Sequence, residues 1–341
     1  MKVVSARILG LGPFDDLTIS FADDAGRPKD LLVVQGGGGV GKTTLLAAIA
    51  STRPGAAVAL PRQRGRDERA TVVVDYALGD DDPARPHPLR VCSPMASLGE
   101  PEAEALLRRR EQAQFDRAAE SGGFALVGFS SARWFSRAST VLTSPERTVL
   151  RHDPRATHAF DDGMRGDLAR DTKQVLAYAS VAAALAPSEP VHVARAEGLR
   201  HAVDTLLAPV ELAYAGVDPG SLEPTFRAGS QVWSFDELPT YVRHLVALGA
   251  LSARALSAAY PDEDPRRAEG VVLVDDAAAH LPPHVEVALP ELLRAALPRV
   301  QWVLTTSSPL VAARVDRGDV VALRRIGDGV VAFDGADACL H

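Results

Sequence analysis

The residues best suited to chemistry form one glycine-rich stretch, LLVVQGGGGVGKTT, at positions 31–44. Within it, Gly36, Gly41, Lys42 and Thr43 fit the spacing Gly-x4-Gly-Lys-Thr. Glycines permit backbone angles that turn successive N–H groups into one concave anion-binding nest, and a following helix adds the positive end of its dipole. A lysine ammonium and a hydroxyl beside such a nest suit a phosphate chain and Mg²⁺. The stretch therefore predicts a phosphate-binding P-loop.

We expect the nucleotide contacts to come from this loop and its flanks. Lys42 would reach the β- and γ-phosphates, and the Thr43 hydroxyl would ligate Mg²⁺. The other expected contacts line the same loop, and they are Gln35, Gly36, Gly37, Gly38, Gly39, Val40, Gly41 and Thr44. Only four of the 37 basic residues are lysines, and one of them is Lys42. This choice favours chemistry that needs a compact ammonium rather than a planar guanidinium.

Two neighbouring carboxylates follow an apolar run near the other end of the chain. Val271–Val274 precedes Asp275 and Asp276. If the run is a parallel strand, it delivers both acids to the carboxyl edge of the sheet, where Asp275 would hold Mg²⁺ and Asp276 would orient a water for attack. The alternative is a core strand that ends in a solvated acidic turn. The segment alone leaves both interpretations open.

Hydrophobic patterns predict the elements around these residues. The alternation of Leu17, Ile19 and Phe21 indicates a half-buried strand. Apolar and turn signals elsewhere predict a strand at 31–35, helices at 43–51, about 100–119 and 171–185, and a hairpin at 320–335. In that hairpin we expect the tight turn at Asp328-Gly329, with positive φ.

The run at 271–315 resembles the SMC/ABC-type ATPase heads, specifically the small AAA-like heads related to OLD nucleases and to DNA double-strand-break repair ATPases. The resemblance rests on four segments: Asp275-Asp276, His280-Leu281-Pro282-Pro283, Gln301–Leu304 and Thr306–Pro309. ARILGLGPFDDLTISF, residues 6–21, also looks like the opening hairpin of these heads. The match covers roughly residues 1–55 and 225–330.

The spacing of the two motifs separates two branches of P-loop proteins. GGVGKTT looks like the ParA/MinD branch, but the extra lysine of that branch is replaced here by Gly37. Asp275 lies 233 residues beyond Lys42, which is too far for that branch and natural for a head with an inserted lobe. In the middle of the chain, FALVGFSSARWFS (124–136) resembles the family's strand that carries an arginine near the nucleotide, here Arg133.

The resemblance implies an α/β P-loop NTPase of the ABC/SMC head type, with a mixed sheet, an antiparallel N-terminal subsheet and an inserted helical lobe. We expect one head over residues 1–341. Its nucleotide-binding core would comprise about 1–90 and 225–341, and the partly helical lobe about 91–224. The implied cofactors are ATP and Mg²⁺, with Thr43 and Asp275 as the metal ligands.

The sequence departs from the family pattern where the family does chemistry. Asp276 replaces a glutamate that polarises the lytic water and is one methylene shorter; a misplacement of about 1 Å can cost roughly 100-fold in rate. Ser307 replaces a histidine that senses the γ-phosphate, and it is the second expected catalytic residue. In SFDELPTYVRHL, Pro239 and Tyr241 replace the serine and glycine that contact the partner head's nucleotide. Pro239 could equally start the helix that follows.

Two functional hypotheses remain open. In the first, the chain is a slow ATPase head that dimerises on ATP and drives or gates a partner or effector, with a link to DNA or to phage defence implied by the family alone. In the second, it is a catalytically degenerate regulatory or scaffold subunit that uses ATP as a structural switch. The expected partner is a second head, identical or different, or an effector subunit.

Composition limits the other classes of function. A net charge of −7 and a pI of about 5.7 leave nucleic-acid binding unsupported, although a local basic stripe is not excluded. The N-terminal residues do not resemble a signal peptide, and no apolar run is long enough to span a bilayer, so we expect a cytoplasmic protein without membrane contact. Cys92 and Cys339 form no metal-binding or paired motif.

Overall fold

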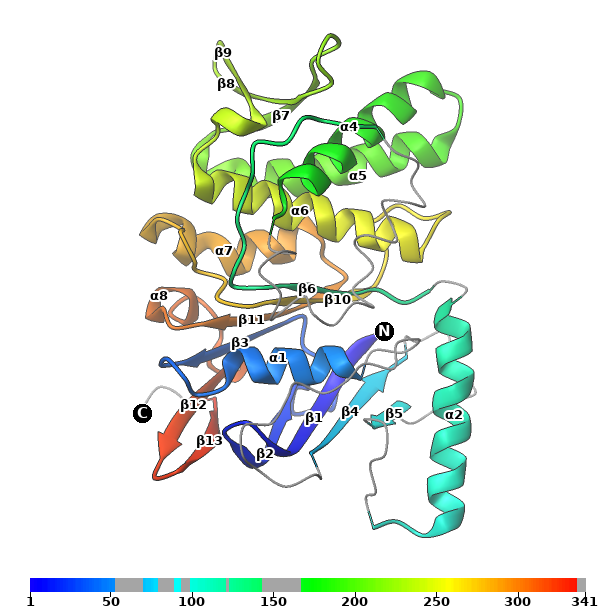
Figure 1. Ribbon diagram of the computed structural model, residues 1–341, viewed down its shortest axis with the longest axis vertical. Coiled ribbons are helices and arrows are strands. Elements are labelled where there is room, and N and C mark those ends of the chain that lie inside the picture. Colours follow the sequence, from blue (N-terminus) through cyan, green and yellow to red (C-terminus); the bar gives the residue numbers. More distant parts are fainter. Residues whose placement is uncertain (53–69, 79–88, 93–98, 121–122, 143–166, 336–341) are drawn as a thin grey trace.

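A computed structural model describes residues 1–52, 70–78, 89–92, 99–120, 123–142 and 167–335. The central element is a six-stranded sheet. Helix α1 and a separate antiparallel sheet lie on one side of it (Figure 1). Helices α4 to α7 cover the opposite side, and a small three-stranded sheet lies beyond them. No helix in these residues is long and apolar enough to cross a membrane.

The six-stranded sheet brings the two sequence motifs together. Its order is β13-β12-β3-β11-β10-β6, and all neighbours pair in parallel except β12 and β13. The strands are β3 (Leu31–Gly36), β6 (Leu126–Phe129), β10 (Gly270–Val274), β11 (Val300–Thr306), β12 (Val320–Ile326) and β13 (Gly329–Asp334). Because β3, β10 and β11 are parallel, their carboxyl ends meet at one edge of the sheet.

Alternating side chains of the central strands build two separate cores. On β3, Leu31 and Val33 belong to the core beneath α4 to α7, whereas Leu32 and Val34 belong to the core shared with α1 and the antiparallel sheet. β10 divides in the same way. Successive side chains of a strand point to opposite faces, so a continuous apolar run is the pattern of a sheet covered on both sides.

The antiparallel sheet has the order β2-β1-β4-β5. Its strands are β1 (Lys2–Leu11), β2 (Phe14–Ser20), β4 (Thr71–Ala77) and β5 (Leu89–Cys92). Buried Gln301 of β11 connects the antiparallel sheet to the six-stranded sheet. The Gln301 side chain accepts a hydrogen bond from Val3 N at 2.7 Å and donates to Val3 O at 2.9 Å and to Lys29 O at 3.0 Å. A fully satisfied buried amide of this kind fixes the relative position of the two sheets.

The helices pack mainly on one face. They are α1 (Lys42–Ser51), α2 (Glu102–Glu120), α4 (Ala169–Leu185), α5 (Pro190–Leu207), α6 (Thr240–Ala259), α7 (Pro283–Ala296) and α8 (Pro309–Ala312). The three-stranded sheet consists of β7 (Ala213–Val217), β8 (Pro224–Ala228) and β9 (Gln231–Ser234). It joins the carboxyl end of α5 to the start of α6.

The predicted α/β fold with an antiparallel N-terminal subsheet and an inserted helical lobe is confirmed. The expected turn at Asp328-Gly329 is wrong by one residue. Ile326 pairs with Gly329, so the turn consists of Gly327 and Asp328, and the positive φ of 60° falls on Gly327. Glycine carries that conformation without the Cβ clash that an aspartate would meet.

The proposed division of the chain into core and lobe stays a prediction. Within the range 91–224, β6 pairs with β10 in the six-stranded sheet, and α4 and α5 form part of the helical layer. Cys92 is buried and carries a free thiol, whereas Cys339 lies outside the described residues.

Candidate nucleotide site

The glycine-rich loop connects the end of β3 to the start of α1. Gly39 and Gly41 have φ values of 73° and 92°, in the left-handed region that glycine tolerates best. A Cβ on Gly36 would lie 2.9 Å from Leu323 O and 2.8 Å from a Val40 methyl carbon. A Cβ on Gly37, Gly38 or Gly39 would meet nothing within 4 Å. The outer glycines are thus fixed by close packing, while the middle of the loop has an open side.

The turn of the N-terminal hairpin supports the loop from below. A Cβ on Gly41 would lie 2.5 Å from Phe14 Cζ and 2.6 Å from Pro13 Cγ, and a Cβ on Gly12 would lie 3.2 Å from Thr44 Cγ2. The Gly-Pro-Phe turn therefore packs directly against the first turn of α1. This contact fixes the position of the hairpin turn relative to the glycine-rich loop.

The start of α1 is suited to receive an anion. Gly41 is its N-cap residue, without a side-chain hydrogen bond, and the first turn contains no acidic residue. The N–H groups of an uncapped first turn and the helix dipole both favour a negative ligand. Within the loop, the side chain of Val40 is buried, and Thr44 in the first turn of α1 is half-buried.

Lys42 lies across the loop. Its Nζ donates to the carbonyls of Gly36 and Gly37, both at 2.8 Å. Burial lowers the pKa of Lys42, and the charges of Asp276 and Asp275 oppose that shift. The charges of those two carboxylates therefore act on the ammonium group, as in a site for a phosphate chain and a cation.

Asp275 accepts two hydroxyl hydrogen bonds at the carboxyl end of β10. Thr43 Oγ1 donates to Oδ2 at 2.7 Å, and Thr305 Oγ1 donates to Oδ1 at 2.6 Å. Asp275 is only 2% exposed. The alternative of a solvated acidic turn is therefore wrong for Asp275, because its carboxylate is buried against the P-loop helix.

The pair of Thr43 and Asp275 also fits a magnesium ion. It offers one hydroxyl and one carboxylate oxygen, and Mg²⁺ is commonly held by such a sparse protein set with water and phosphate oxygens completing its octahedron. In the part of the chain that the structure describes, no cluster of three or more His, Cys, Asp or Glu is arranged for a metal. Binding of a cation at Thr43 and Asp275 would therefore require additional oxygen ligands from a bound phosphate group.

Asp276 has a half-buried side chain and an unusual backbone, with φ of 47°. Its N–H donates to Thr305 Oγ1 at 2.9 Å, and its carbonyl accepts from Arg133 Nη2 at 2.9 Å. A non-glycine residue in the left-handed region is strained and needs such support. Thr305 and Arg133 thus hold the acidic pair from both sides.

Arg133 is almost fully buried, at 5% exposed. Its Nη1 donates to Ser130 O at 2.8 Å and to Asp275 O at 2.6 Å. Burial lowers its pKa to about 10, while the charges of Asp275 and Asp276 oppose that shift, so it remains a cation at neutral pH. The arginine expected near the nucleotide is placed behind the acidic pair, where it holds main-chain carbonyls.

Solved structures resemble this fold over nearly the whole chain. The SMC head domain from Thermotoga maritima matches with TM-score 0.50 and 15% identity, over 98% of this chain and 99% of that one. An SmcHead bound to the C-winged helix domain of ScpA matches with TM-score 0.53 and 13% identity, over 100% of both chains. This chain has the SMC-type head fold of P-loop ATPases.

A third structure agrees with this assignment. It is the Smc head domain with an extended coiled coil, bound to the C-terminal domain of ScpA, derived from Pyrococcus furiosus. It matches with TM-score 0.50 and 13% identity, over 98% of this chain and 96% of that one. No protein-family model matches the sequence, and no curated protein matches it. At such low identity, the comparison establishes the head fold alone.

The head contains two arginines near the loop that sequence reasoning missed. On β12, Arg324 Nη2 donates to Gln35 Oε1 at 2.8 Å, and Arg325 Nη2 donates to Gly39 O at 2.8 Å. Thr305 was also missed. No sequence signal marks the arginines, because only the parallel pairing of β12 with β3 brings them to the loop.

The residues after β11 divide between exposed and structural roles. Ser307 is exposed at the end of the strand. Ser308 caps α8, with Oγ accepting from Leu310 N and donating to Glu286. Thr306 is buried and its Oγ1 accepts from Ser308 N at 2.9 Å. Of these residues, Ser307 has the side chain most open to a ligand.

The segment expected to correspond to a signature motif, around Leu238–Tyr241, leads into α6. Leu238 is buried, Pro239 is the N-cap residue, and Tyr241 packs against the core beneath the helical layer. Pro239 is exposed, with φ of −54°. The proline therefore precedes the helix directly, and the tyrosine has a structural role in its first turn.

Proposed function

We propose that this head binds ATP with Mg²⁺ at the loop 36–44. The observation that carries the proposal is the 2.7 Å hydrogen bond between Thr43 and Asp275, since it places the P-loop hydroxyl against the carboxylate of a distant strand. Lys42 beside the open glycines and the uncapped start of α1 supply the phosphate-binding half. The three features together match the donor set that a nucleoside triphosphate requires.

Each residue has a definite task in this proposal. Lys42 exchanges its two carbonyl acceptors for phosphate oxygens, and Thr43 and Asp275 hold the cation. Mg²⁺ supplies charge neutralisation on the phosphates when it is bound. Arg324 and Arg325 keep Gln35 and Gly39 in place at the rim.

For hydrolysis, we propose that Asp276 orients the attacking water and that Ser307 lies on the γ-phosphate side. A carboxylate one methylene shorter than the family's glutamate would be displaced by about 1 Å, which costs roughly 100-fold. We therefore propose a slow ATPase. The second candidate, a nucleotide-gated subunit without turnover, is favoured by Pro239 and Tyr241 at the segment expected to face a partner head.

The proposed partner is a second head, either another copy of this chain or a related subunit with an intact signature motif. Two of the three similar SMC heads were solved bound to domains of ScpA, which supports the proposal that this head binds a partner. ATP-dependent closure of two heads would be the conformational output. We propose a cytoplasmic location. A nucleic-acid partner stays open, and the net charge of −7 gives it no support.

Two measurements test the proposal. ATP with Mg²⁺ should raise the melting temperature of the wild type and of Lys2→Ala, whose lysine forms an ion pair with Asp30 away from the loop. Lys42→Ala should show no rise, and a rise equal to that of wild type would overturn nucleotide binding at this loop. The second measurement is phosphate release from ATP. Release by the wild type that is lost in both Lys42→Ala and Asp276→Asn supports the slow ATPase. ATP binding by the wild type without phosphate release supports the nucleotide-gated subunit.

A further inference from the structure

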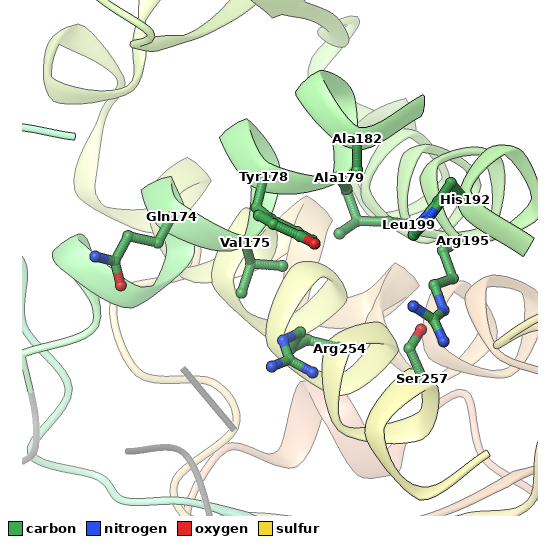
Figure 2. A pocket seen from close by; sticks show the side chains of 10 residues that line it. All are labelled: Gln174, Val175, Tyr178, Ala179, Ala182, His192, Arg195, Leu199, Arg254 and Ser257. Carbon is green, nitrogen blue, oxygen red and sulfur yellow. The ribbon is translucent and has the colours of Figure 1, made fainter. Parts of the chain in front are cut away.

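A cavity lies in the helical layer and is lined by helices α4, α5 and α6. Its volume is about 60 Å³. Figure 2 shows the guanidinium groups of Arg195 and Arg254 and the hydroxyl of Ser257 on one side, with Ala179 and Ala182 of α4 on the other. Roughly four or more waters, or a ligand group of similar size, would fill such a volume. None of its lining residues belongs to the nucleotide site.

Two arginines line this cavity, Arg195 and Arg254, and none of its described lining residues is an aspartate or glutamate. His192 Nε2 lies 3.1 Å from Glu189 Oε2, at the exposed edge. Burial lowers the pKa of Arg254, and the neighbouring charge of Arg195 lowers it further. Two arginines that share a partly buried space favour an anion between them.

Arg195 has unused hydrogen-bonding capacity. Its Nη2 donates to the carbonyl of Pro261, while its buried Nε has no partner among the described residues. Buried polar atoms normally find partners, so this donor indicates that an acceptor completes the site. The Nε–Nη2 edge of a guanidinium is shaped to receive both oxygens of a carboxylate.

The remaining wall of the cavity is mainly apolar, and Tyr178 of α4 adds one hydroxyl to it. Val175, Ala179, Ala182 and Leu199 line it, so a bare anion would leave these side chains uncovered. We propose that this cavity binds a carboxylate on a short aliphatic stem, with the carboxylate at Arg195 and Arg254 and the stem against the α4 side. This site is independent of nucleotide binding at the P-loop.

Butyrate is a suitable probe, and its neutral isostere butyramide and the stemless carboxylate formate are the comparisons. Ligand-observed NMR titrations of the full chain should give saturable binding for butyrate and much weaker binding for the other two. Formate binding as tight as butyrate would overturn the role of the stem, and equal binding of butyramide would overturn the role of the charge. No saturable butyrate binding would overturn the proposal as a whole.

Variants locate the binding. Arg195→Gln should weaken butyrate by about tenfold or more, since a charged hydrogen bond is lost. Arg170→Gln, an exposed arginine of α4 outside the cavity, should bind as the wild type does. Ala182→Leu fills the apolar side of the cavity without changing its charge and should abolish butyrate binding. If folded Ala182→Leu and Arg195→Gln both keep wild-type affinity, the proposal is wrong.

Discussion

Thr43 and Asp275 are 232 residues apart in the sequence and are joined by a hydrogen bond of 2.7 Å. The bond connects the first turn of α1 to the carboxyl end of β10, across the intervening strand β11. Because Thr305 occupies the other carboxylate oxygen of Asp275, the acid is held in one orientation before any ligand arrives. Such preorganisation lowers the cost of assembling a metal site.

The first prediction concerns this acid. Asp275→Asn should weaken ATP binding in the presence of Mg²⁺ by about tenfold or more, because an amide oxygen carries no charge for the cation. Binding measured in EDTA should change much less, so the ratio of the two Kd values should fall towards one. Exposed Asp262→Asn is the matched control and should keep the wild-type ratio. An unchanged ratio in Asp275→Asn would exclude this acid from the metal site.

A second prediction separates the two kinds of glycine in the loop. Gly41→Ala places a Cβ 2.5 Å from Phe14 Cζ at a φ of 92°, so we expect a loss of about 2–4 kcal/mol in unfolding free energy. Gly38→Ala, which has no neighbour within 4 Å of its Cβ position, should cost less than about 1 kcal/mol. Urea denaturation of both variants measures the difference. Equal losses would contradict the packing of the hairpin turn against α1.

The third prediction follows from a buried histidine on α6. His244 is 2% exposed, and burial, followed by the charges of Arg133, His280 and Arg243, lowers its pKa from 6.5 to about 3. Its ring stacks on the ring of His280, with 5.2 Å between the ring centroids. It also packs edge-on against Phe135, with 4.9 Å between the centroids. Below pH 6.5 the unfolded chain gains a proton at this position that the folded protein does not, so acid favours unfolding.

Stability should therefore decline as the pH falls below 6.5, at up to about 1.4 kcal/mol per pH unit from this residue. His244→Phe preserves an aromatic ring and should flatten the dependence of unfolding free energy on pH between 7 and 5. His284→Asn, at an exposed position on α7, should leave the slope unchanged. The same slope in His244→Phe as in wild type would show that this ring does not titrate on unfolding.

The fourth prediction tests the support of the acidic pair. Arg133→Met removes donors to the carbonyls of Ser130, Asp275 and Asp276. We expect a loss of about 3 kcal/mol in stability, because buried acceptors lose their partners. Arg137→Met, exposed in the same loop, is the control and should lose less than about 0.5 kcal/mol. A buried arginine that proved dispensable would leave the strained φ of Asp276 without an explanation.

Local patterns were sufficient for much of the architecture. The apolar runs before Gly36 and Asp275 predicted the buried strands β3 and β10, and the spacing at 171–185 predicted α4. These predictions hold because a run covered on both faces, or an apolar stripe of helical period, is set by burial along one short segment. The error at Asp328-Gly329 arose because the register of a hairpin depends on both of its strands.

The sequence by itself determined that a P-loop precedes α1, that an acidic pair ends a buried strand, and that the chain resembles an SMC/ABC head. Only the tertiary structure decided that Asp275 meets Thr43 and Thr305, that Arg133 binds main-chain carbonyls, and that Arg324 and Arg325 reach the loop from β12. The physical reason is that strand order and register bring residues of distant segments to one sheet edge, and neither is contained in the periodicity of any single segment.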